Sequence, residues 1–383
     1  MAADYRICTR CLMDTSDPDI VFDENGVCNH CRQYEKLVAQ YVSTGDAGKR
    51  QLTALSARVK KAERGKTYDC VLGVSGGIDS TYVAYLAREL ALKPYLVALD
   101  NGYDTLPARR NALRIADYLG TELHAHRIDP REFRDLQMAY LKSGVLNIEV
   151  LTDHAIRALL YRTAAKLGVK YVLSGTNIVT EGILPPAWGG YNSSADLRNI
   201  VDIYRNHGSG LSLSTFPQIS ISETIHYHWM RGIRFVSPLN YVLYDKQAAK
   251  DLFAKEFGYE DYGPKHCESV FTRFYQFYIL PRRLGVDKRR AHLACLVMSQ
   301  QMTREEALAE LATPPYTAEQ FACDRKYVAD YLAISEDELE ALVALPIRSA
   351  TDYATGRTGL RVVAVVTNPR AVVQWIARSV AAR

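Results

Sequence analysis

A glycine-rich turn between a predicted strand and a predicted helix limits the fold of this chain more than any other feature. Residues 69–74 are a short apolar run, the letters SGGIDS follow at 75–80, and a helical pattern continues to residue 90. Gly76 and Gly77 allow a sharp turn that brings backbone N–H groups close to a ligand. The first turn of the helix adds unpaired N–H groups and the positive end of its dipole. This combination predicts a phosphate site at the end of a strand.

The residues of this turn indicate a nucleotide with a bound metal ion. Asp79 would repel a bare phosphate, so we expect it to hold Mg²⁺ on the phosphates. The Lys of the Walker sequence GxxxxGK[ST] is missing, and the dinucleotide sequence GxGxxG is absent. The segment resembles the SGGxDS signature of PP-loop ATP pyrophosphatases, the superfamily of GMP synthetase, NAD synthetase and tRNA-lysidine synthetase. This resemblance implies that ATP adenylates a substrate oxygen. The predicted ATP-binding residues of the turn are Ser75, Gly76, Gly77, Asp79 and Ser80.

Strand-like and helix-like segments alternate between residues 66 and 240, which predicts a doubly wound parallel α/β sheet of the PP-loop type. The predicted strands are residues 69–74, 95–99, 123–128 and 171–174, and the predicted helices are 80–90, 107–119 and 153–167. Beyond residue 240 the pattern is mainly helical, and Thr303 with Glu306 and Ser335 with Glu338 have the spacing of capping boxes. The predicted regions are a four-cysteine module (1–34), a helical linker broken at 45–48 (35–65), a nucleotide-binding domain (66–240) and a mainly helical substrate-binding region (241–383).

Polar residues beyond the predicted strands are further candidates for the site. The carboxyl ends of parallel strands line the ligand crevice of an open α/β sheet. Asp100 follows the second strand, where it either meets ATP or caps the next helix. Gly175 and Thr176 follow the fourth strand and are expected to close over the nucleotide, and Glu181 is either a second Mg²⁺ ligand or a solvated carboxylate. His154 is either a general base or a structural histidine. The predicted catalytic residues are Ser75, Asp79, His154 and Glu181.

Two CxxC pairs near the N-terminus predict a structural metal site. Cys8 and Cys11 are separated from Cys28 and Cys31 by sixteen residues, which is the spacing of a zinc ribbon or knuckle. Four thiolates close a tetrahedral site and leave no open position for catalysis. We therefore expect Zn²⁺ to stabilise this small module separately from the ATP chemistry, with an iron–sulfur centre or redox-active pairs as alternatives.

Five segments carry a resemblance to a known family: residues 8–31, 177–185, 265–281, 282–293 and 302–308. In these segments the chain resembles the N-acetyl sugar amidotransferase family of lipopolysaccharide and O-antigen biosynthesis, and the resemblance weakens after about residue 345. It implies an ATP-dependent ligase that adenylates the acetamido oxygen of a nucleotide-activated N-acetyl sugar, releasing pyrophosphate. Ammonia then displaces AMP and leaves an acetamidino group.

The source of ammonia is predicted to lie outside this chain. Ala2 stands where an N-terminal-nucleophile glutaminase needs cysteine, and no glycine-flanked cysteine forms a nucleophile elbow. The resemblance implies a separate partner pair similar to the glutaminase and cyclase subunits of imidazole glycerol phosphate synthase. For the sugar substrate, a cationic cluster is predicted to bind diphosphate or a sugar carboxylate. Its members are Lys265, Arg273, Arg282, Arg283, Lys288, Arg289 and Arg290.

Two alternatives remain open from the sequence. One is a tRNA-modifying PP-loop enzyme, either a lysidine-type ligase or a thiolase that uses Cys267 or Cys295 as sulfur carrier. The other is a non-catalytic nucleotide-binding scaffold. The net charge of +4 over 383 residues lacks the concentrated basic surface of a nucleic-acid binder. No apolar run is long enough to span a bilayer, so we expect a cytoplasmic protein, with an amphipathic end helix within residues 361–380.

Overall fold

The computed structural model describes residues 5–189, 194–356 and 359. Its centre is a parallel sheet with the strand order β3-β2-β1-β4-β5. The strands are β1 (Cys70–Gly73), β2 (Pro94–Asp100), β3 (Leu123–Arg127), β4 (Tyr171–Leu173) and β5 (Arg234–Val236). The first four lie where the sequence predicts strands, whereas β5 is short, mostly exposed and absent from the prediction. The direction of winding reverses between β1 and β4, so the carboxyl ends of these strands flank a crevice.

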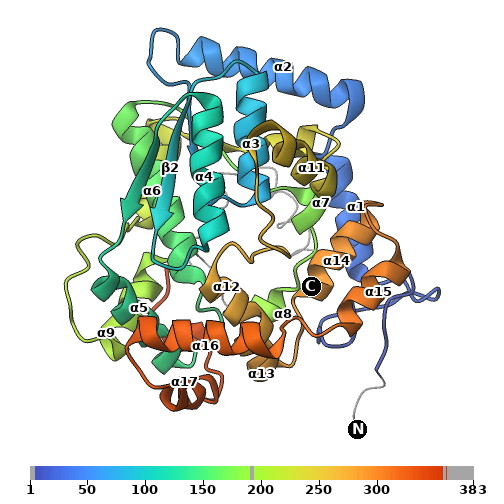
Figure 1. Cartoon of the computed structure of the whole chain (residues 1–383), viewed down its shortest axis with the longest axis vertical. Coiled ribbons are helices and arrows are strands. Elements are labelled where there is room, and N and C mark those ends of the chain that lie inside the picture. Colours follow the sequence, from blue (N-terminus) through green and yellow to red (C-terminus); the bar gives the residue numbers. More distant parts are fainter. Residues whose placement is uncertain (1–4, 190–193, 357–358, 360–383) are drawn as a thin grey trace.

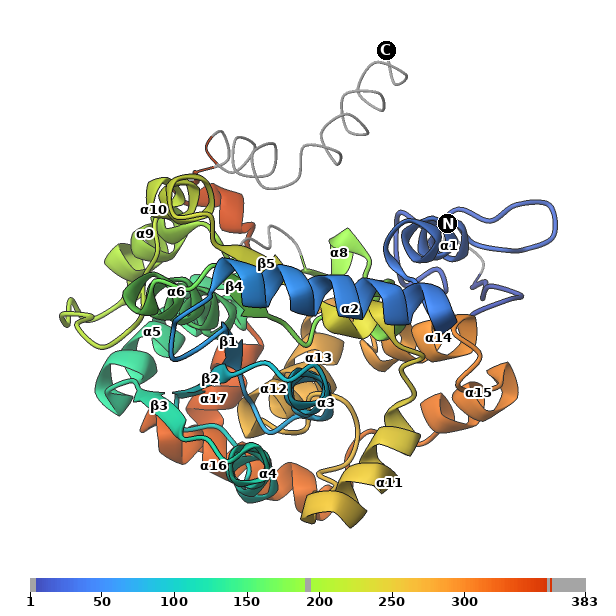
Figure 2. The ribbon, with the colours of Figure 1, turned by 90° about the horizontal axis from the view of Figure 1, so that it is seen from above.

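Helices cover both faces of the sheet, which confirms the doubly wound arrangement (Figures 1 and 2). Cys70 and Leu72 of β1 point to one face, and Val71 points to the other, because side chains alternate along a strand. The first face is covered by α2 (Gly45–Ala62), α3 (Ile78–Glu89), α4 (Leu106–Leu119) and α11 (Lys246–Phe257). The second face packs against α6 (Val150–Leu167). Burial on both faces explains why these strands are continuous apolar runs in the sequence.

The chain beyond the sheet is mainly helical, as predicted. The remaining helices are α1 (Asn29–Tyr41), α5 (Pro130–Ser143), α7 (Ile178–Glu181), α8 (Pro186–Gly189), α9 (Leu197–His207), α10 (Ile221–Ile225), α12 (Val270–Phe274), α13 (Leu280–Leu284), α14 (Arg289–Met298), α15 (Arg304–Ala312), α16 (Ala318–Leu332) and α17 (Glu336–Val343). Two π-helical turns, η1 (His226–Met230) and η3 (Tyr275–Ile279), and two 3₁₀ turns, η2 (Pro238–Tyr241) and η4 (Ala350–Asp352), complete them. The capping boxes at Thr303 and Ser335 are confirmed. Helices α12 to α17 share one core with α5 and the N-terminal cysteines.

The N-terminal helices differ from the prediction in one respect. The predicted break at residues 45–48 is wrong, because α1 ends at Tyr41 and α2 begins at Gly45. Gly48 lies inside α2, where a Cβ atom would lie 2.2 Å from the backbone oxygen of Tyr241. This glycine therefore allows α2 to pack closely against a loop. The local sequence alone cannot distinguish a glycine of this kind from one that ends a helix.

Among the residues that the structure describes, no helix is both long and apolar enough to cross a bilayer. The end helix expected within residues 361–380 lies outside the described residues.

Candidate active site

The glycine-rich turn (residues 75–80, here the phosphate turn) joins the end of β1 to the start of α3. Gly76 has φ +74°, and a Cβ atom at this position would lie 1.9 Å from the backbone oxygen of Ala108 in α4. Gly77 is the N-cap of α3. Only glycine fits at residue 76 beside α4. The packing of α3 against α4 and the conformation of the turn therefore both depend on this glycine.

The N–H groups of the phosphate turn point at hydroxyl groups. The Gly77 N–H donates to Ser75 Oγ at 3.2 Å, and the Ile78 N–H donates to the Tyr262 hydroxyl oxygen at 3.1 Å. Ser80 Oγ donates to the backbone oxygen of Gly77 at 3.0 Å. An oxygen of a phosphate can replace such a hydroxyl acceptor and gain the attraction of the helix dipole.

A cavity of about 170 Å³ opens beside the phosphate turn and brings the two predicted Mg²⁺ ligands, Asp79 and Glu181, together. Each faces a lysine. Lys246 Nζ lies 3.6 Å from Asp79 Oδ2, and Lys265 Nζ lies 2.7 Å from Glu181 Oε1. Gly175 also lines this cavity. Because carboxylate oxygens suit Mg²⁺ and the turn suits phosphate, these residues fit a Mg²⁺ ion carried by a nucleotide.

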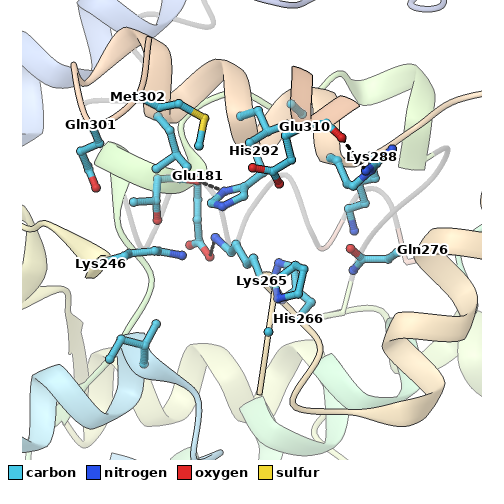
Figure 3. A pocket seen from close by; sticks show the side chains of 18 of the residues that line it. Glu181, Lys246, Lys265, His266, Gln276, Lys288, His292, Gln301, Met302 and Glu310 are labelled. Atoms are coloured by element: carbon cyan, nitrogen blue, oxygen red, sulfur yellow. Dashed lines mark hydrogen bonds and ion pairs between the residues drawn. The ribbon is translucent and has the colours of Figure 1, made fainter. Parts of the chain in front are cut away.

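A second cavity, of about 550 Å³, adjoins the first and carries an excess of positive charge (the basic cavity). Its cationic side chains are Lys246, Lys250, Lys265, Lys288 and Arg289, and its carboxylates are Glu181, Asp245 and Glu310. Figure 3 shows Lys246, Lys265 and Glu181 converging on one point of this cavity from different elements. Burial lowers the pKa of Lys246, although the charge of Asp79 opposes this effect. The charge balance of this cavity suits an anionic ligand.

A third cavity, of about 380 Å³, lies at the carboxyl ends of β1, β2 and β4 and is rich in carboxylates (the acidic cavity). Its apolar wall includes Val74, Val97, Leu99, Leu160 and Leu173, and its carboxylates are Asp104, Glu149, Asp153 and Glu268. Burial raises the pKa of Asp104 and that of Asp153 to about 7, and it raises the pKa of Glu268 to about 6. An apolar wall with a few hydrogen-bonding groups is typical of small-molecule sites.

His266 lines all three cavities. Its φ of 66° is in the left-handed region, whereas the other non-glycine residues with positive φ in the described chain follow the ends of α3, α14 and α16. Such a backbone conformation costs energy, and its position where three cavities meet indicates a functional constraint. Burial and, after it, the charge of Lys265 lower the pKa of His266 well below its ordinary value, so its imidazole is neutral near pH 7.

Two of the predicted nucleotide residues have protein partners nearby. Asp100 lies 3.8 Å from Arg109 and 3.7 Å from Arg127, and it does not line the three cavities. Thr176 shares a hydrogen bond of 3.1 Å with Ser237, in the segment that follows β5. Asn101 and Asp104 of the same loop line the acidic cavity in place of Asp100.

His154 has a structural position. It is fully buried, its Nδ1 lies 2.6 Å from the backbone oxygen of Ser194, and its Nε2 accepts the N–H of Ile219 at 3.1 Å. Both ring nitrogens are therefore engaged, with the proton on Nδ1, and burial lowers the pKa of His154 to about 4. The prediction that His154 acts as general base is corrected, because no ring nitrogen remains for a substrate.

The predicted cationic residues do not form one cluster. The partners are Asp324 for Arg273, Glu340 for Arg282, the backbone oxygens of Gly144 and Val145 for Arg283, Asp287 for Arg289, and Asp14 with the backbone oxygen of Leu12 for Arg290. Only Lys265, Lys288 and Arg289 of the predicted set line the basic cavity. The expectation of substrate contact is therefore corrected for the four other arginines, whose guanidinium groups contact protein.

The four N-terminal cysteines form a compact buried cluster. Their sulfur atoms lie within 4.8 Å of one another, with Cys8–Cys31 at 3.8 Å, Cys11–Cys28 at 3.6 Å and Cys28–Cys31 at 3.7 Å. Four sulfur atoms about 2.3 Å from a central Zn²⁺ ion would lie about 3.8 Å apart in a regular tetrahedron. The N–H groups of Cys11 and Cys28 point at Cys8 Sγ, as expected for a thiolate. The cluster therefore fits a tetrahedral metal ion.

The two candidate sulfur carriers are buried thiols. Cys267 is 2% exposed, and burial raises its pKa to about 12. Cys295 is fully buried, accepts the N–H of Ile183 at 3.2 Å, and has its pKa raised by burial to about 11. A persulfide-carrying cysteine needs access and a lowered pKa, so neither residue suits sulfur transfer.

Two parts of the chain match known protein families. Residues 65–176 match the asparagine synthase family, and residues 268–366 match the C-terminal domain of the family described as LPS biosynthesis protein WbpG-like. The NH3-dependent NAD synthetase of Campylobacter jejuni is 22% identical, over 35% of this chain and 59% of that chain, with a TM-score of 0.28. The NMN synthetase of Francisella tularensis is 17% identical, over 58% of this chain and 100% of that chain, with a TM-score of 0.30.

No curated protein matches the chain. The first family match contains the phosphate turn, and the second contains Lys288 and Arg289 of the basic cavity, whereas Glu181, Lys246, Lys265 and His266 lie between the two matched ranges. The chain thus contains a segment similar to the asparagine synthase family and, after it, a segment similar to the C-terminal domain of WbpG-like lipopolysaccharide biosynthesis proteins.

Proposed function

We propose that this protein is an ATP-dependent amidotransferase that converts the acetamido group of a nucleotide-activated N-acetyl sugar into an acetamidino group. The observation that carries the proposal is the position of the phosphate turn between the basic and the acidic cavity, with Asp79 and Glu181 beside it. The acidic cavity suits the adenosine of ATP, because its wall is apolar and its carboxylates can accept hydrogen bonds from ribose hydroxyls. The basic cavity suits the diphosphate of the sugar nucleotide.

The proposed reaction has two displacement steps. The acetamido oxygen attacks the α-phosphorus of ATP, and the bond to pyrophosphate breaks. Ammonia then attacks the imidoyl carbon, the bond to AMP breaks, and one proton leaves as the amidinium product forms. The N–H groups of the phosphate turn and the ammonium groups of Lys246 and Lys265 stabilise the charge on pyrophosphate. His266 lies where the cavities meet, and its neutral imidazole can accept a hydrogen bond from the attacking ammonia and so orient it, while the released proton passes to solvent.

Two kinds of metal site fit the proposal. Asp79 and Glu181 would hold Mg²⁺, which draws negative charge from the phosphates when it is bound. Cys8, Cys11, Cys28 and Cys31 would hold Zn²⁺, whose closed coordination leaves it a structural role. Ammonia would come from solution or from the separate glutaminase and cyclase-like pair that the sequence resemblance implies.

The test is incubation of the protein with ATP, Mg²⁺, ammonium and a panel of nucleotide-activated N-acetyl sugars. We expect AMP and pyrophosphate to form with one sugar, together with a product in which NH has replaced an oxygen atom, measured by mass spectrometry. Asp79→Ala should abolish both products and leave the metal content of the cysteines unchanged. Asp117→Ala, an exposed position on α4, is the matched control. Formation of ADP in place of AMP, or normal turnover by Asp79→Ala, would refute the proposal.

A further inference from the structure

The segment that carries Glu181 is held by groups from distant parts of the chain. Helix α7 is only four residues long, and a helix of this length has no stability of its own. Its backbone oxygen at Val179 accepts the Tyr34 hydroxyl at 2.8 Å, and the Ile178 N–H donates to Asn240 at 2.9 Å. His292 Nδ1 lies 3.3 Å from the backbone oxygen of Thr180. The position of Glu181 therefore depends on these outside partners.

Tyr34 connects α7 to the cysteine cluster. It lies on α1, one turn after Cys31, and it is 3% exposed. Its ring also packs against Gly182, directly after Glu181, where a Cβ atom would lie 2.9 Å from the ring. Helix α1 therefore contacts α7 through both a hydrogen bond and a close ring contact. The same helix contains Cys31, and Cys28 is its N-cap residue.

The cysteine cluster is also fixed to α14, which contacts α1, and to α15, which packs on α14 (Figures 1 and 2). Arg304 donates to the backbone oxygens of Cys8 and Cys11 at 3.0 and 3.1 Å. Arg290 donates to the backbone oxygen of Leu12 at 2.6 Å and pairs with Asp14 at 3.1 Å. Because α14 carries His292, the cluster reaches both α7 and the opposite wall of the basic cavity.

We infer that Tyr34 is a positioning residue through which the cysteine-bearing N-terminal segment fixes Glu181 in the ATP site. The two sites expected from the sequence to be separate are then coupled, and the N-terminal segment contributes to binding of the magnesium nucleotide. This inference rests on the proposed role of Glu181 in binding Mg²⁺ with ATP. The contacts at Val179 and Gly182 carry it, since both lie within two residues of Glu181.

The test is a double-mutant cycle between Tyr34→Phe and Glu181→Gln, with the affinity for Mg²⁺ and α,β-methylene-ATP measured by calorimetry. Loss of one hydrogen bond should weaken binding by roughly three- to ten-fold in the wild-type background. It should have no further effect in the Glu181→Gln background, because the effect acts through Glu181. The zinc content of Tyr34→Phe, measured by mass spectrometry of the metal, should equal that of the wild type. Tyr41→Phe, at the far end of α1, should bind like the wild type.

Equal weakening by Tyr34→Phe in both backgrounds, or the same weakening by Tyr41→Phe, would show a merely structural effect and overturn the inference. Wild-type affinity of Tyr34→Phe would overturn it as well, while leaving the proposed function intact if Glu181→Gln binds weakly. Wild-type affinity of Glu181→Gln would overturn both the inference and the assignment of Glu181 as a Mg²⁺ ligand, so the two failures can be told apart.

Discussion

Replacement of Glu268 by Gln is predicted to raise the free energy of unfolding above about pH 6. Burial and, after it, the charge of Asp79 raise the pKa of Glu268 from 4.5 to about 6. The difference between 4.5 and about 6 corresponds to about 2 kcal/mol at about 1.36 kcal/mol for each pH unit. Because the pKa of Glu268 is higher in the folded state, its ionisation lowers the free energy of unfolding. This destabilisation is absent below the unfolded-state pKa and reaches its full value above the folded-state pKa. Gln keeps the shape of the side chain and removes the charge.

Urea denaturation at a series of pH values between about 4 and 8 measures this effect. We expect Glu268→Gln to be about 2 kcal/mol more stable than the wild type at pH 8 and equally stable near pH 4. Glu260→Gln is the matched control on the same loop, because Arg110 and then Arg114 lower the pKa of Glu260. Its effect should therefore have the opposite sign, with stability lost above the unfolded-state pKa. A gain for Glu268→Gln that does not change with pH would refute the reasoning.

Three further predictions concern Gly76, His154 and Cys28. Gly76→Ala places a Cβ atom 1.9 Å from the backbone oxygen of Ala108, so it should lower the melting temperature and abolish binding of the ATP analogue in calorimetry. His154→Gln should remove part of the acid sensitivity of the fold: burial lowers the pKa of His154 from 6.5 to about 4, so the wild type should lose up to about 3 kcal/mol as pH falls from 6.5 to 4. Cys28→Ser should lower both the melting temperature and the zinc content, and a stable metal-free variant with normal turnover would contradict the structural role.

Strands β1, β2 and β4 could be predicted because buried residues make them apolar runs. Strands β1, β2, β3 and β4 are apolar or alternating runs that end in polar loops, and the helices between them have clear periodicity. Strand β5 could not be predicted, because it is three residues long and mostly exposed. Helix α5 also lies outside the predicted segments, although Asp129 caps its first turn and Gly144 ends it in the left-handed conformation. These local signals are present in the sequence, but they are weaker than the apolar periodicity used for the prediction.

Sequence reasoning could identify only part of the candidate site. The phosphate turn is a contiguous motif, so its residues can be read together, and Glu181 follows a predicted strand. Tyr244, Lys246 and Tyr262 come from the region after the sheet, and only the fold brings them to the turn. Tyr244 donates to Asp79, and Tyr262 accepts the N–H of Ile78. No local spacing relates these residues to the turn, because their proximity depends on the packing of α11 against α3.

The arginines are predicted to form one cluster, but arginines that are close in the sequence contact different parts of the protein. Arg282 and Arg283 are adjacent, yet Arg282 pairs with Glu340 and Arg283 donates to backbone oxygens in the loop after α5. Consecutive residues on a helix are directed about a quarter of a turn apart and so face different neighbours. A dense run of arginines is therefore weak evidence for a common ligand unless the spacing places the side chains on one face.

The distribution of charge around the phosphate turn favours one orientation of the two substrates. The lysines of the basic cavity attract phosphate groups, whereas the acidic cavity has a single lysine, Lys288, beside its four carboxylates and offers phosphate less attraction. ATP should therefore place its nucleoside in the acidic cavity and its pyrophosphate at the turn, while the anionic part of the second substrate enters from the basic side. In the proposed reaction the α-phosphorus would lie near His266, where both cavities meet, and a neutral acetamido oxygen would reach it there from the opposite side. The charge difference between the cavities and the apolar wall of the acidic cavity together predict which substrate occupies which cavity.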